Sequence, residues 1–213
     1  MTRRPAAIAG AAVLALVLSA CGGDSSSSSQ AADPDNPYLP TESPSVTVTL
    51  MDPPADYSTI QGEGFTISAP GEFQQQRRTT TNGEPMLVLE KPSAVEAVPQ
   101  RVAVVRDVAP QQSAAEQSYA LETAKAAAGP DAEVQRTEVE VPGEHGPAFL
   151  ITWKESRPSK GAADVEVTYW QLMEQVGDDL ILNVVAFAPS AEFETSEVSK
   201  ILRTFVADDS TSA

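Results

Sequence analysis

The sequence predicts an α+β domain: an antiparallel sheet of about six strands with helices covering its faces. Strand-like runs of apolar residues recur along the chain of 213 residues. The run at 180–188 is apolar at both alternating positions, so both faces of that strand must be covered. Two segments with helical patterns, at about 114–128 and 191–206, are available to cover them.

The first half of the domain predicts short strands joined by turns. These strands are expected at 45–50, 64–70, 73–80, 86–91 and 101–108. The first is stopped by Pro53 and Pro54, which is typical of an edge strand. Asn82-Gly83 indicates a hairpin turn between the third and the fourth.

A helix with clear end signals follows. Ser113 and Glu116 have the spacing of a capping box, and the Gly-Pro pair at 129–130 predicts the stop. The helix is rich in alanine, and its large apolar residues are only Tyr119 and Leu121. It can therefore lie close to a sheet but buries little surface per turn.

The second half predicts long strands and a closing helix. The strands are expected at 133–141, 148–153, 165–176 and 180–188. The helix at 191–206 carries an apolar stripe at the spacing i, i+3, i+4 and i+7: Val198, Ile201, Leu202 and Phe205.

The N-terminus has the layout of a secretory signal peptide. Two arginines precede an uncharged run at 5–18, and small residues then lead to Cys21, the only cysteine. The Leu-Ser-Ala-Cys motif at 18–21 resembles the lipobox of bacterial lipoproteins, which implies a diacylglyceryl thioether on Cys21. As a helix the run would span about 21 Å, less than the ~30 Å of a hydrocarbon core, which disfavours a transmembrane helix.

The segment after Cys21 predicts a flexible tether, because Gly, Ser, Pro and Asp dominate it. Twenty-three such residues reach roughly 25–30 Å. The expected organisation is a signal peptide at 1–20, a lipidated tether at 21–44, one globular domain at 45–207 and a polar tail at 208–213.

The charge of the chain disfavours several partners. The sequence has 14 basic and 30 acidic residues, a net charge of −16, and loss of the leader with its two arginines makes this −18. Such a surface repels nucleic acid and anionic lipid headgroups. Membrane attachment is therefore expected through the lipid, on the extracytoplasmic face of the cell membrane.

Catalytic and metal-binding residues are scarce. His145 is the only histidine and lies in a Pro-Gly/Gly-Pro segment, which predicts an exposed turn residue and not a triad member. Zinc normally requires several His or Cys ligands, and a Cys-His pair is unavailable once Cys21 is acylated. We therefore expect no catalytic residue, no metal site and no cofactor besides the covalent lipid.

Charged side chains elsewhere have structural interpretations. Glu138 and Glu140 fit the wet face of an outer strand, beside Glu144. Asp178-Asp179 fits a hairpin turn better than a calcium loop. Four arginines concentrate positive charge and are interpreted as protection of strand edges, with a partner patch as the alternative: Arg77, Arg78, Arg101 and Arg106.

The order of elements, with the Gly-Phe-Thr-Ile-Ser-Ala-Pro segment at 64–70 and Ile-Leu-Arg-Thr-Phe at 201–205, resembles the Mog1/PsbP-like fold. Within it the chain resembles the actinobacterial LpqN/LpqT lipoproteins, which share the lipobox, the serine-rich tether and the single domain. The resemblance covers about 58–206. It implies an α/β/α sandwich and a non-enzymatic binding or accessory protein of the cell envelope.

Three functions follow as hypotheses. The first is an anchored module that recognises another envelope protein through a sheet edge or a helix-sheet groove. The second is a carrier of an apolar small molecule or lipid beneath the alanine-rich helix, which requires an apolar cavity of ~300 Å³ or more. The third is a hydrolase with two converging carboxylates about 5–9 Å apart. A filled core with an exposed apolar patch would favour the first.

Overall fold

The computed structural model describes residues 51–95, 98–141, 145–158 and 163–208. The chain divides into two units, Met1–Pro40 and Thr41–Ala213, and every described residue belongs to the second. Cys21, the predicted tether and the predicted strand at 45–50 lie outside the described residues. No helix in the described part has both the length and the apolar character needed to cross a bilayer.

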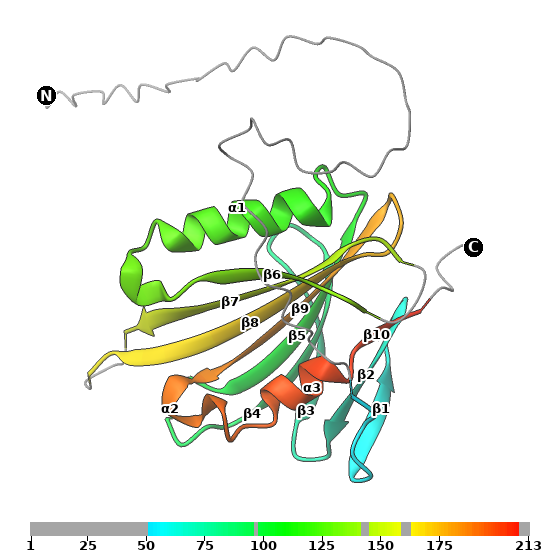
Figure 1. The fold of residues 1–213 in the computed structure, drawn as a ribbon. Coiled ribbons are helices and arrows are strands. Elements are labelled where there is room, and N and C mark those ends of the chain that lie inside the picture. Colours follow the sequence, from blue (N-terminus) through cyan, green and yellow to red (C-terminus); the bar gives the residue numbers. More distant parts are fainter. Residues whose placement is uncertain (1–50, 96–97, 142–144, 159–162, 209–213) are drawn as a thin grey trace, which may run out of the picture. The chain divides into compact units, whose positions relative to one another are not determined.

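The centre of the domain is an antiparallel sheet in the order β3-β4-β5-β9-β8-β7-β6 (Figure 1). Its strands are β3 (Gln74–Thr79), β4 (Pro85–Lys91), β5 (Gln100–Val108), β6 (Gln135–Val139), β7 (Ala148–Arg157), β8 (Val165–Gln175) and β9 (Leu180–Pro189). Gly83 makes the predicted β3–β4 turn at φ +94°, where glycine is favoured. The pairing of β5 with β9 joins the two halves of the chain.

A smaller antiparallel sheet has the order β1-β2-β10. Its strands are β1 (Tyr57–Gln61), β2 (Phe65–Pro70) and β10 (Val206–Ala207). Only β2 was predicted. β1 is mostly exposed and lacks a clear apolar alternation, whereas β10 has only two residues and forms because it can pair with β2.

Four helical segments complete the described residues: α1 (Ala114–Ala126), the 3₁₀ turn η1 (Pro130–Ala132), α2 (Ser190–Phe193) and α3 (Val198–Arg203). The predicted capping box is present at the start of α1. The Ser113 hydroxyl accepts from the Glu116 amide at 3.3 Å, and the Glu116 carboxylate accepts from the Ser113 amide at 2.9 Å. α1 packs on β7, β6 and β8, whereas α3 packs on β9 and β5.

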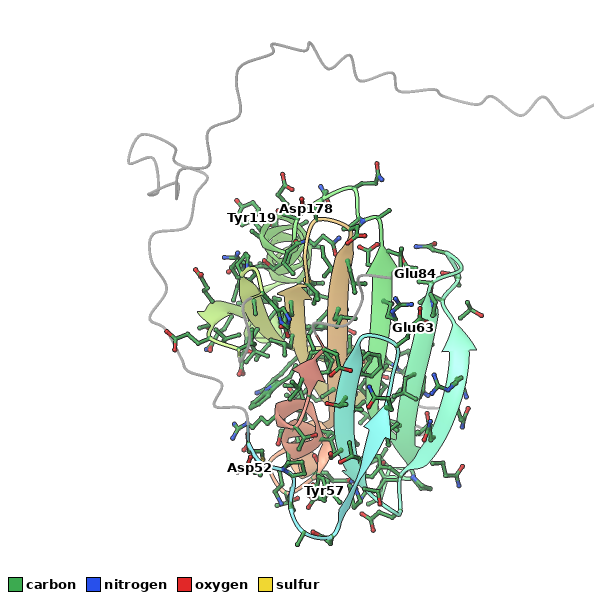
Figure 2. The ribbon with its side chains drawn as sticks, turned by 90° about the vertical axis from the view of Figure 1, so that its right-hand side faces the viewer. Asp52, Tyr57, Glu63, Glu84, Tyr119 and Asp178 are labelled. Atoms are coloured by element: carbon green, nitrogen blue, oxygen red, sulfur yellow. The ribbon has the colours of Figure 1, made fainter. Side chains whose placement is uncertain are left out.

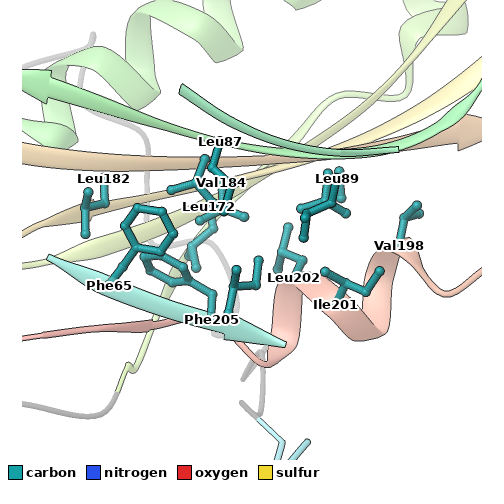
Figure 3. Close-up of a cluster of buried hydrophobic side chains, with 14 of the residues drawn as sticks. Phe65, Leu87, Leu89, Leu172, Leu182, Val184, Val198, Ile201, Leu202 and Phe205 are labelled. Atoms are coloured by element: carbon teal, nitrogen blue, oxygen red, sulfur yellow. The ribbon is translucent and has the colours of Figure 1, made fainter. Parts of the chain in front are cut away.

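The seven-stranded sheet has two different faces. We call the side under α1 the helix face and the opposite side the core face. The core face packs against the small sheet, α2 and α3, and its cluster includes Phe65, Leu172, Leu202 and Phe205. The rings of Phe65 and Phe205 lie 5.8 Å apart within this cluster (Figure 3). A separate apolar cluster forms under α1 and includes Trp153.

The α+β class is confirmed, but the expected number of strands is wrong. About six strands in one sheet were expected, and the described residues form seven in one sheet and three in another. Two of the observed strands, β1 and β10, were not predicted at any position, because each forms by pairing with β2.

The closing helix predicted at 191–206 is also wrong, because it is broken into α2 and α3 and ends at Arg203. In the break, the Ser196 hydroxyl donates to the Phe193 carbonyl at 2.7 Å, a local bond that competes with helix continuation. At the end, the Thr204 hydroxyl donates to the Ser68 carbonyl and accepts from the Ser68 amide, which ties the chain to β2.

Candidate binding groove

An open groove of about 500 Å³ lies on the helix face, beside α1. It exists because α1 packs over β6, β7 and β8 and leaves β5 and β9 beside it. Gln117 and Ala120 of α1 form one wall, and Thr80 and Glu84 at the β3–β4 turn form another. Five side chains of β5, β8 and β9 form the floor: Val105, Gln171, Met173, Asn183 and Val185.

Two amide side chains lie on this floor. Gln171 of β8 donates from Nε2 to Oδ1 of Asn183 on β9 at 3.0 Å. Asn183 is only 8% exposed. Each amide group offers two donors and an acceptor with two lone pairs, so this one bond uses a small part of their capacity. A ligand in the groove can use the rest.

The walls hold their polar groups in place through hydrogen bonds. Gln117 donates from Nε2 to a carboxylate oxygen of Asp107 at 2.7 Å. At the other wall, the Thr80 hydroxyl donates to the Glu84 carboxylate at 2.9 Å and accepts from the Glu84 amide at 3.1 Å. These bonds limit side-chain motion, so less entropy is lost when a ligand binds.

The chemistry of the groove is that of a hydrogen-bonding site with aliphatic contacts. Neutral amides dominate its polar lining, with the carboxylates of Glu84 and Asp107 at its margin, while Val105 and Val185 supply apolar floor. Such a surface suits neutral ligands that both donate and accept hydrogen bonds, such as an extended peptide backbone.

One feature of the sequence points to this groove: polar residues at positions where the strand pattern predicts apolar ones. Asn183 interrupts β9, which is otherwise apolar, and Gln171 lies between Tyr169 and Met173 among the alternate apolar residues of β8. Both belong to the same face of the sheet. A polar residue within a buried strand requires a hydrogen-bond partner or water. That requirement points to an open region of the face.

Beneath α1 itself the space is filled. Phe149, Ile151 and Trp153 of β7 are at most 4% exposed there, and Leu121 of the helix packs against the same cluster. The adjoining groove is open and polar, unlike the apolar cavity that a carrier function requires. The exposed large apolar residues lie singly on three different elements: Val108, Tyr119 and Val206.

The prediction that His145 is an exposed turn residue is wrong. Its side chain is 7% exposed, and Nδ1 lies 2.6 Å from a carboxylate oxygen of Glu174, which is 1% exposed. Burial raises the pKa of Glu174, although the hydrogen bond with His145 acts in the opposite direction. The sequence analysis did not single out Glu174, because its partner, His145, is 29 residues away in the sequence.

The acidic residues on and next to β6 are exposed, as expected. Glu138 and Glu140 are exposed and flank Val139, which is buried, so they form a wet edge. Asp178-Asp179 lies in the turn between β8 and β9, and Glu144 lies outside the described residues. No group of three metal-ligating side chains occurs in the described part of the chain.

The four arginines do not form one patch. Arg77 and Arg78 lie on β3, the edge strand, as the edge-protection hypothesis expects. Arg101 and Arg106 lie on β5, an interior strand, so edge protection does not explain them. Arg101 pairs with Glu90, whereas Arg106 NH1 lies 2.9 Å from Glu63 Oε2.

The chain thus folds into an α+β domain with an open, polar groove beside α1. No protein-family model matches the chain, and no curated protein matches it either.

Proposed function

We propose that the protein is a lipid-anchored binding module on the extracytoplasmic face of a bacterial cell membrane. Cys21 would carry the diacylglyceryl anchor, as its resemblance to a lipobox implies. The order of elements, with the segments at 64–70 and 201–205, suggests an actinobacterial LpqN/LpqT-type protein with a Mog1/PsbP-like α/β/α sandwich. Packing of α1 on one face of the sheet and of α3 on the other supports that arrangement.

The groove beside α1 is the observation that carries the binding role. We propose that it takes an extended, largely neutral segment of another envelope protein. The amides of Gln171, Asn183 and Gln117 would pair with backbone groups of that segment, and the aliphatic floor would contact its side chains. The role is non-enzymatic in this proposal, since binding alone uses all of these groups.

The anchor is tested by palmitate labelling of the full chain and by substitution of Cys21. Cells that produce the full chain are given radiolabelled palmitate, and we expect label in the protein and its partition into detergent. Cys21→Ala should lose both. Retention of residues 1–20 together with a lack of label in the natural chain would overturn the anchor.

The groove is tested by crosslinking in intact cells. A photoreactive amino acid replaces Ala120 on the groove wall, and the matched control replaces Tyr119, which is exposed on the same helix outside the groove (Figure 2). We expect one defined protein adduct from position 120 and none from 119. The double variant Gln171→Leu with Asn183→Leu should lose that adduct while the protein stays folded. A lipid adduct at position 120, with no protein, would favour the carrier function instead.

A further inference from the structure

A second pocket lies at the other side of the sheet, where the small sheet meets β3, β4 and β5. It encloses about 110 Å³. Three arginines line it, Arg77, Arg78 and Arg106, together with Glu63. Arg77 shares the core face with Arg106, because its register partner Leu87 is buried in the core-face cluster, whereas the Arg78 side chain donates to Gln76. The apolar part of its lining includes Phe65, Met86, Leu87 and Val104. In a chain with a net charge of −16, this pocket has a local excess of positive charge.

Arg106 is the unusual member of this set. It belongs to the core face, because Val104 on the same strand and Leu182 opposite it in the register are both buried in the core-face cluster. Its side chain is 13% exposed, and its Nε atom is buried without a hydrogen-bond partner among the described residues. A buried cation with unmet hydrogen-bonding capacity is costly, so such a residue in an interior strand requires a function or a compensating anion.

The anion that Arg106 has is a weak partner. Glu63 lies on the turn between β1 and β2, at the end of the small sheet (Figure 2). Its side chain is 71% exposed, so water competes strongly for the carboxylate. The turn can reach this position because residue 62 is glycine: a Cβ there would lie 2.2 Å from the Phe65 ring. Glu63 therefore shows that a carboxylate fits Arg106, and it is held there only loosely.

We propose that this pocket binds the carboxylate of a small organic acid, which replaces Glu63 on Arg106. Arg77 would supply further positive charge on the same face, and the apolar lining would contact a short carbon chain. The volume is below the ~300 Å³ of a drug-sized site, which limits the ligand to a few carbon atoms. The negative field of the whole chain favours a monovalent carboxylate over phosphate.

The carboxylate could come from a free short-chain acid or from the C-terminus of a peptide. The test therefore uses four probes: sodium propionate, N-acetylalanine, its amide and inorganic phosphate. The full chain, in non-ionic detergent, is titrated with each while NMR signals of the Arg106 guanidinium and of the β5 amides are followed. We expect millimolar binding of propionate or N-acetylalanine, whichever source fits, and none of the amide.

Four variants decide the proposal. Glu63→Gln removes the internal competitor and should lower the Kd by about fivefold to tenfold. Arg106→Met should raise it more than tenfold, and Arg77→Gln should raise it by a smaller factor. Arg101→Met is the matched control, an arginine of the same strand that already pairs with Glu90, and should leave the Kd unchanged.

Three results would overturn the proposal. They are an unchanged Kd in Glu63→Gln, equal binding of the acid and its amide, and inorganic phosphate binding as tightly as propionate. The Glu63 variant changes an exposed turn residue, so it remains informative even if Arg106→Met fails to fold.

Discussion

The two faces of the seven-stranded sheet are covered to different extents. The core face is closed by a second sheet and two short helices, and its residues, such as Leu172, Val184 and Leu202, are fully buried. The helix face has one long helix over β6, β7 and β8, and beside that helix it carries the amides of Gln171 and Asn183. The first arrangement maximises the apolar area removed from water, whereas the second leaves polar groups within reach of a ligand.

This difference separates stability from recognition within one sheet. Closure of the core face depends on segments from both ends of the domain, since β2 pairs with both β1 and β10. The groove on the helix face depends mainly on the position of α1. Substitutions on the core face should therefore affect unfolding, and substitutions in the groove should affect binding.

The largest expected effect comes from the same truncation made on each side. Leu202→Ala removes a fully buried side chain of α3 and should lower the free energy of unfolding by about 3 kcal/mol. Leu121→Ala, on α1, removes a partly buried side chain and should cost about 1 kcal/mol. Chemical denaturation of both variants measures the difference, and equal losses would contradict the comparison.

Next in size is the bond that fastens the small sheet to α3. The Tyr57 hydroxyl donates to the Glu197 carboxylate, and this bond lowers the pKa of Glu197. A lowered folded-state pKa stabilises the protein above the ordinary carboxyl pKa, and that contribution is lost as the pH falls through the lowered value. Tyr57→Phe should cost about 1.5 kcal/mol at pH 7 and less at pH 3. A loss independent of pH would show that the ionised carboxylate is not the partner.

The buried carboxyl of the core face should give an effect of opposite sign. Burial raises the pKa of Glu174, so the folded protein keeps its proton at pH values where the unfolded chain has lost it. The contribution of Glu174 to stability therefore falls as the pH rises above about 4.3. Between pH 4 and pH 7, the free energy of unfolding of Glu174→Gln should rise by on the order of 1 kcal/mol relative to that of the natural protein. Glu138→Gln, at an exposed position, is the matched control in the same denaturation series.

The smallest expected effect concerns the start of α1, which forms a wall of the groove. Ser113→Ala removes the capping hydroxyl and should cost about 0.5 kcal/mol. Gln112 and Gln117 near this end line the groove. The same change should therefore clearly reduce the yield of the partner crosslink at position 120, while the melting temperature falls only slightly. Ser113→Thr, which keeps the hydroxyl, should restore both.

Much of the fold could be predicted because the signals are local. Strands β2 to β9 were expected close to their observed positions, since apolar or alternating runs of residues locate a strand without knowledge of its partner. Tyr169 and Leu172, which are an odd number of residues apart on β8, lie on opposite faces of the sheet, in the cluster under α1 and in the core-face cluster. The capping box formed by Ser113 and Glu116 could be predicted because it involves only residues within one helical turn.

The candidate sites could not be predicted in the same way. Gln171 and Asn183 are 12 residues apart and meet only because β8 pairs with β9. Arg106 and Glu63 are farther apart, and the turn that brings them together belongs to the other sheet. His145 was misassigned for the same reason, since Glu174 is 29 residues away.

The sequence by itself determined the class of the domain, the approximate positions of strands β2 to β9 and the start of α1, because hydrophobic period and capping act over a few residues. Tertiary structure decided where the last helix breaks, that Val206 and Ala207 form a strand, and which part of the helix face stays open. These features depend on which distant segments pack together, and the free energy of that packing outweighs local propensity.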